Sequence, residues 1–218
     1  MPNKRFESDL GDAARRRLNS TLRGRVKGLI ATTQQARAAL DAALANFCDD
    51  FNNARITPIL EADIAGYLYY RLVVNGCPTS MVYLATRVCG EAARSRKLDI
   101  VIGSLSRDIA CVTPLLISEL KVFQRWGHSP QQMNQRFSGH LGDNLPSLEQ
   151  AAAVLPRGRL AIVADLFVSR QLRGYLAGTW DGRRRKDVIS AKCKEIGATF
   201  IWLHPKQESD DLICEEVS

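Results

Sequence analysis

The chain has 218 residues, with 30 lysine or arginine against 23 aspartate or glutamate, and its formal net charge is +7. This length suits one sizeable domain with an extension, and the excess of cations suits a polyanionic partner such as nucleic acid. The sequence argues against a membrane span, a structural zinc site and a P-loop enzyme, because it has no long apolar run, no zinc-type Cys and His spacing and no phosphate-binding glycine loop.

Residues 8–51 carry apolar side chains at helical spacing and are expected to form two amphipathic helices, the second capped by Thr32 or Thr33. The remaining surface of the first helix is strongly basic. Its cations are Arg15, Arg16, Arg17, Arg23, Arg25 and Lys27. This face would contact phosphates or support dimerisation, or it would be an ordinary solvated face packed on the domain.

A further helix is expected from Thr57-Pro58, where Thr can cap and Pro suits the first turn, to Asn75-Gly76. Glu61 lies beside its apolar stripe and can turn toward the interior, whereas Asp63 points more nearly to solvent. Glu61 would therefore reach a site inside the protein, or it would only complement the dipole of the helix as a first-turn acid.

Three β-like segments follow, at residues 81–89, 97–102 and 115–123, and they predict a three-stranded meander. The second carries Asp99, and the third carries Glu119 and Lys121 among apolar residues. Charged side chains are almost never fully buried unless they are paired or bind a metal. Because side chains alternate along a strand, Glu119 and Lys121 share one face. We expect these three groups to form a compact cation site; the alternative is two half-exposed strands with solvated charges.

The rest of the chain alternates between helix and strand, which implies parallel pairing. Helices are expected at 129–138, beginning at Ser129-Pro130, at 145–155 and at 187–196, ending at Gly197; strands are expected at 159–168 and 198–203. Asp165 is interpreted as closing its strand. Gln131, Gln132 and Gln135 lie on the first of these helices, either as substrate contacts or as surface residues.

A turn at residues 180–186 combines an aromatic residue with four adjacent cations: Trp180, Arg183, Arg184, Arg185 and Lys186. It is the best candidate for a loop that grips phosphates, with Trp180 available for stacking on a base. The alternative is ordinary solvated loop charge.

The six cysteines show no Cys-x-x-Cys pair, and Cys89 and Cys111 lie among apolar neighbours. We interpret all six as reduced, buried thiols of a cytoplasmic protein. The segment after Gln207 is rich in acids and is expected to be a frayed end.

The Asp99, Glu119 and Lys121 pattern, Asp-(x)19-Glu-x-Lys, resembles the PD-(D/E)XK nuclease superfamily, although Leu98 stands where the name motif has Pro. The resemblance covers roughly residues 57–204 in element order. It implies an α/β fold with a mixed central sheet flanked by helices, the restriction endonuclease-like αβββαβ core. The expected organisation is an N-terminal helical extension at 1–54, this core at 55–206 and an acidic tail at 207–218.

The resemblance also implies roles for individual residues. Asp99, Glu119 and the carbonyl of Leu120 would hold Mg²⁺, for which Mn²⁺ can substitute, while Lys121 would orient the attacking water, stabilise the developing charge or act as a base. In the superfamily the first core helix often donates a Glu to the active site, and Glu61 matches that position. It would support a second metal or a water. In some branches a Gln of the later helix, here Gln135, touches the substrate.

The function expected from this resemblance is a Mg²⁺-dependent DNA endonuclease, of restriction or mobile-element origin, acting as a homodimer. The alternative from another class is a non-catalytic module on the same fold that binds nucleic acid or protein. Whether the substrate is DNA or RNA, and which sequence is recognised, stays open at this stage.

Overall fold

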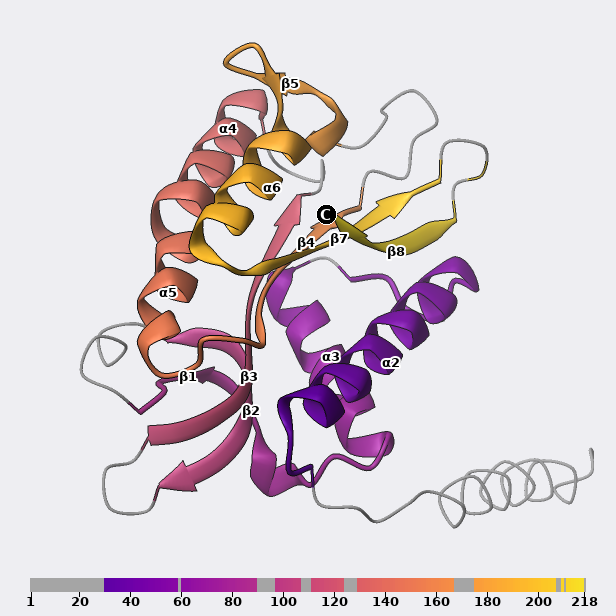
Figure 1. Ribbon diagram of the computed structural model, residues 1–218. Helices are drawn as coiled ribbons and strands as arrows, with labels where there is room; N and C mark the ends of the chain where they lie inside the picture. Colours follow the sequence, from indigo (N-terminus) through magenta and orange to yellow (C-terminus); the bar gives the residue numbers. More distant parts are fainter. Residues whose placement is uncertain are drawn as a thin grey trace, which may run out of the picture.

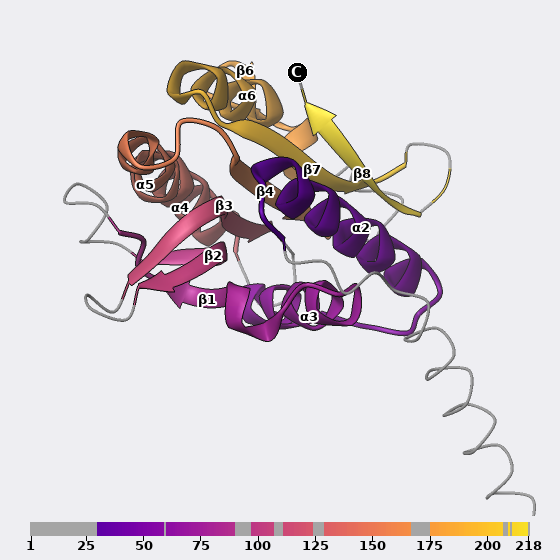
Figure 2. The ribbon, with the colours of Figure 1, turned by 60° about the horizontal axis from the view of Figure 1, so that its bottom comes forward.

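The computed structural model describes residues 30–58, 60–89, 97–106, 111–123, 129–166, 175–206, 209 and 211–217. The basic cluster expected between Arg15 and Lys27 lies outside these residues. Within them, a mixed six-stranded sheet is covered by helices on both faces (Figures 1 and 2). The expected α/β architecture with a mixed central sheet is therefore confirmed.

The strands lie in the order β1-β2-β3-β4-β7-β8. Their bounds are β1 Val82–Thr86, β2 Leu98–Ser106, β3 Cys111–Phe123, β4 Arg159–Asp165, β7 Thr199–Pro205 and β8 Leu212–Val217. Strands β1, β2 and β3 are antiparallel, as expected of a meander. Strands β3, β4 and β7 are parallel, and β8 returns antiparallel to β7. A short hairpin of β5 (Thr179–Trp180) and β6 (Arg183–Arg184) stands apart from this sheet.

Alternation along β3 separates the two faces of the sheet. Leu116, Leu120 and Val122 pack into the core shared with α2 (Thr33–Asn52) and α3 (Glu61–Val74). Ile117 and Phe123 pack into the core on the other face. The helices on that face are α4 (Pro130–Gly139), α5 (Leu145–Gln150) and α6 (Arg185–Ile196). Glu119 and Lys121 alternate with Leu120, so they belong to the face of α4, α5 and α6, as the sequence predicts.

Local capping signals account for three helix ends. Thr32 caps α2 through a bond from the Gln35 N–H, and Ser129 caps α4 in the same way. Gly197 ends α6 with a positive φ of 66°, a conformation that favours glycine. The expected start of α3 at Thr57-Pro58 is wrong.

Helix α3 begins at Glu61 because the carboxylate of Asp63 accepts the Leu60 N–H at 2.7 Å. This bond satisfies the N–H of the N-cap residue, which lies three residues later in the chain than the Thr-Pro pair suggests. Glu61 is therefore the first residue of α3, and its side chain lies at the N-terminal end of the helix.

The expectation of a frayed end after Gln207 is wrong for residues 212–217, which form the edge strand β8. Leu212 is buried, and its backbone exchanges two hydrogen bonds with the side-chain amide of Asn52 in α2. Two acids of the segment have cationic partners: Glu215 lies 3.1 Å from Lys186, and Glu216 lies 2.7 Å from Arg37. Burial and ion pairing together hold the segment on the sheet.

The expectation of reduced thiols is wrong for Cys89 and Cys111, which form a disulfide. A short parallel bridge between Val88 and Val112 aligns the two segments, and the Cys89 N–H donates to the Val112 carbonyl at 2.8 Å. Their Cα atoms are consequently only 5.1 Å apart. Cys48, Cys77, Cys193 and Cys214 are free thiols.

Candidate active site

The end of β3 extends beyond its neighbour β2. Pairing of the two strands stops at Ile100 and Ser118, whereas β3 continues to Phe123. On its other side β3 stays paired with β4 as far as Phe123 and Asp165. From Glu119 onwards, β3 makes no ladder pairs with β2, and the backbone N–H groups on this edge require other partners.

Two carboxylates supply these partners. The Leu120 N–H donates to Asp99 Oδ2 at 2.7 Å, and the Val122 N–H donates to Glu61 Oε2 at 3.3 Å. Asp99 belongs to β2, and Glu61 belongs to the first turn of α3, on the opposite face of the sheet from α4. The protruding backbone of β3 thus holds an acid from the neighbouring strand and an acid from another layer at one edge.

Asp99 and Glu119 form a carboxylate pair. The register of β2 and β3 places them opposite each other, one step beyond the last paired residues Ile100 and Ser118. Glu119 is only 2% exposed, and burial together with the nearby Asp99 charge raises its pKa to about 9. The Asn144 amide donates to Glu119 Oε2 at 3.0 Å and acts in the opposite direction. Burial and the Asp99 charge thus favour the protonated form of Glu119 in the metal-free protein.

Two cations converge on Glu61. Its Oε2 atom lies 3.4 Å from the Lys121 ammonium and 3.7 Å from the Arg136 guanidinium. Arg136 also donates to the Val122 carbonyl at 3.4 Å. In this structure one oxygen of Glu61 therefore contacts two cations and one backbone N–H, and the carboxylate acts as their counter-ion.

Three site residues missed at the sequence level lie at intervals of four: Arg136, His140 and Asn144. Helix α4 continues through a π-helical turn, His140–Asn144, into α5, and such turns occur often at functional sites. His140 is fully buried beside Asn144. Burial and the nearby Lys121 charge lower its pKa to about 3, so the imidazole is neutral. The Arg-x-x-x-His-x-x-x-Asn spacing was the available signal.

The structure brings together five of the residues selected from the sequence: Glu61, Asp99, Glu119, Leu120 and Lys121. Gln135 lies outside this group. It is exposed on α4, one residue before Arg136. The helix thus presents an arginine to the site, at the position next to the expected glutamine.

The basic turn is divided between packed and exposed side chains. Trp180 meets Phe137 edge-on at 5.3 Å, so its ring takes part in the core. Arg185 stacks on Tyr175 at 4.0 Å and donates to Asn134 at 3.0 Å. Arg183 and Arg184 are exposed on β6, and they are the members of the set that the hairpin presents to solvent.

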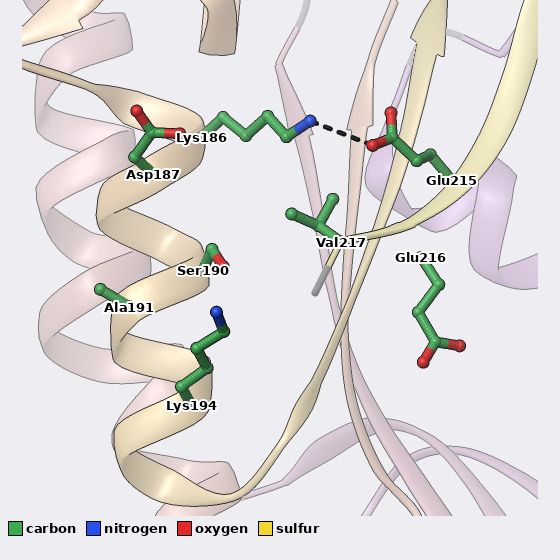
Figure 3. A pocket seen from close by; sticks show the side chains of 8 residues that line it. All are labelled: Lys186, Asp187, Ser190, Ala191, Lys194, Glu215, Glu216 and Val217. Carbon is green, nitrogen blue, oxygen red and sulfur yellow. Dashed lines mark hydrogen bonds and ion pairs between the residues drawn. The ribbon is translucent and has the colours of Figure 1, made fainter.

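Lys186 faces a different feature, the groove between α6 and β8 (Figure 3). Its side chain reaches across this groove of about 440 Å³ to Glu215, and its ammonium lies 4.6 Å from the centre of the Trp202 ring. The lining of the groove includes none of the carboxylates or cations gathered at the end of β3. The groove is therefore separate from the candidate active site.

The donor set of the site suits a hard divalent cation. Two carboxylates, Asp99 and Glu119, lie close enough for the charge of Asp99 to raise the pKa of Glu119, and a bound cation would relieve this repulsion. The Leu120 carbonyl lies on the same side of β3 as its N–H, which points to Asp99. No group of three or more His, Cys, Asp or Glu side chains in the described ranges is arranged to hold a metal ion. The fit therefore depends on two carboxylates and a backbone carbonyl.

Comparisons of the chain with protein-family models, with curated proteins and with solved structures give no match. Among the helices of the described segments, none combines the length and the apolar character needed to cross a lipid bilayer.

Proposed function

We propose that this chain is a Mg²⁺-dependent endodeoxyribonuclease with a restriction endonuclease-like core of the PD-(D/E)XK type. One observation carries the proposal: Glu61, Asp99, Glu119 and Lys121, which are distant in sequence, converge on the uncovered end of β3. Solvated strand charges would have no reason to converge in this way. The order of three antiparallel strands, helix, strand, helix and strand also supports the proposal.

Each side chain has a distinct task in this proposal. Asp99, Glu119 and the Leu120 carbonyl would hold Mg²⁺ or Mn²⁺, which when bound neutralises charge on the phosphate and makes water a better nucleophile. Lys121 would orient the attacking water and stabilise the charge that develops on the phosphoryl group. Glu61 would fix the Lys121 ammonium, which lies 3.4 Å from its carboxylate. Asn144 would orient the Glu119 carboxylate.

Nicking of supercoiled plasmid DNA tests the proposal directly. The wild-type protein is expected to convert supercoiled plasmid to open-circular and linear forms with Mg²⁺ or Mn²⁺, and not in EDTA. Asp99→Ala and Lys121→Ala are expected to lose this activity. Asp49→Ala, which removes an exposed acid of α2, is the matched control and should cleave normally.

Two results would overturn the proposal. The first is equal cleavage by Asp99→Ala and wild-type protein in Mg²⁺. The second is a wild-type protein that shifts DNA without divalent ions and never nicks it, which would indicate a non-catalytic binding module on this fold. A parallel reaction with RNA of the same sequence distinguishes the two nucleic acids.

A further inference from the structure

We propose that Arg136 binds the phosphodiester at the carboxylate site and is a catalytic residue of this chain. The inference rests on the proposed function for the location of the phosphodiester, and it assigns a residue that the Asp-(x)19-Glu-x-Lys pattern does not contain. Its basis is the position of the guanidinium relative to Glu61, Lys121 and the end of β3.

The guanidinium of Arg136 lies at the rim of the site. The side chain is 34% exposed, against 15% for Lys121, so it extends from the carboxylate cluster toward solvent. Its NH2 group is anchored from two directions, by the Val122 carbonyl at 3.4 Å and by Glu61 Oε2 at 3.7 Å. A planar guanidinium holds its N–H groups in a fixed fork that matches phosphate oxygens.

The positive charge of Arg136 would balance the negative charge of the site when metal and substrate are bound. With Mg²⁺ held by ionised Asp99 and Glu119, the positive charges of Lys121 and Arg136 would offset the negative charges of Glu61 and one phosphodiester, and the loaded site would be neutral. Without Arg136 the same complex would carry an excess negative charge, which grows further as charge develops on the phosphoryl oxygens.

A purely structural role for Arg136 makes a different prediction. If the guanidinium only fixed Glu61, its removal would change the cleavage rate but would leave the salt dependence of DNA binding untouched. If Arg136 contacts a phosphate directly, its removal instead makes the slope of log affinity against log salt shallower by about 0.9. Binding in the absence of divalent ions therefore separates the two roles.

The experiment measures fluorescence anisotropy of a labelled DNA duplex in EDTA, across a range of NaCl concentrations, for wild type, Arg136→Gln, Arg136→Lys and Arg157→Gln. Arg157 is an exposed arginine in the turn before β4 and serves as the charge-matched control. We expect Arg136→Gln to lower the salt slope by about one phosphate contact, and Arg136→Lys to retain the slope because it keeps the charge.

Single-turnover cleavage at saturating DNA completes the test. Arg136→Gln is expected to cleave about 100-fold more slowly, as for loss of one donor to a developing anion, and Arg136→Lys to recover part of the rate. An unchanged salt slope in Arg136→Gln, or the same reduction in Arg157→Gln, would overturn the inference. If wild-type protein binds DNA but does not cleave it, the proposed nuclease function fails, while the slope comparison still decides the phosphate contact.

Discussion

Replacing Glu119 with Gln is expected to stabilise the metal-free protein while removing its activity. Glu119 is buried beside Asp99, and its pKa is raised from 4.5 to about 9. Gln has the shape of the protonated acid and can accept the Asn144 bond and donate to Asp99, but it needs no proton. At neutral pH the wild-type chain takes up a proton at Glu119 when it folds, and this uptake costs free energy. The substitution removes that cost.

The magnitude follows from the two pKa values. Between pH 4.5 and about 9, the folded protein keeps a proton that the unfolded chain releases, so stability falls as pH rises through this window. At pH 7 the cost is about 3 kcal/mol, because each pKa unit is worth about 1.4 kcal/mol, and it levels off near ~6 kcal/mol above pH 9. For a domain of this size, Glu119→Gln should raise the melting temperature by about 6–12 °C at pH 7.

Thermal and urea unfolding in EDTA at pH 5 and pH 8 measure this effect. The gain in unfolding free energy of Glu119→Gln should be small at pH 5 and large at pH 8. Glu149→Gln, at an exposed position of α5, is the control and should show no such pH dependence. A gain that is equal at both pH values, or a Gln variant that is less stable than wild type at pH 8, would refute the raised pKa of Glu119.

Three further predictions concern side chains around the core and the site. Asn144→Ala should lower the apparent affinity for Mg²⁺ or the cleavage rate by about 10–100-fold, because it removes the bond that orients Glu119. Plasmid nicking across a range of Mg²⁺ concentrations measures this, and an unchanged Mg²⁺ profile would contradict it. Arg159 is buried and donates to carbonyls at the ends of α5 and α6, so Arg159→Met should lower the unfolding free energy by about 3–5 kcal/mol in urea titration, and a loss below ~1 kcal/mol would show that water replaces it. Removing the disulfide by converting Cys89 and Cys111 to Ser should cost about 3 kcal/mol for a sequence separation of 22, and wild type in reductant should show the same loss.

Local patterns account for much of the fold. The alternation of residues 115–123 assigns Glu119 and Lys121 to one face, and this assignment is confirmed because each face of β3 contacts its own helices. Thr32, Ser129 and Gly197 mark helix ends through bonds that involve only their near neighbours. These features depend on interactions within a few residues of the chain, which the sequence displays directly.

The errors arise where distant segments meet. The pairing of Cys89 with Cys111 depends on a bridge between two segments of the sheet, and the spacing of cysteines does not reveal it. The strand at residues 212–217 exists because Asn52 and two cations hold it, although its composition resembles a polar tail. Composition alone therefore underestimates tertiary stabilisation.

The residues of the candidate site were also predicted only in part from the sequence. The motif selected its acids and its lysine, but it did not contain Arg136 or Asn144, which reach the site only because α4 packs across β3 and passes through a π-helical turn. Trp180, Arg185 and Lys186 were selected for charge and aromaticity, yet their partners come from three other elements. Their surroundings are set by packing that a single sequence does not display.

The open edge of β3 has a consequence for mutagenesis. The main-chain amides of Leu120 and Val122 orient Asp99 and Glu61, so no side-chain truncation at these two positions deletes the contact. An alanine scan along the strand would therefore not detect these two hydrogen bonds to the acids. Amide-to-ester replacement at positions 120 and 122 by chemical ligation would reveal it, since an ester keeps the chain's shape but cannot donate a hydrogen bond.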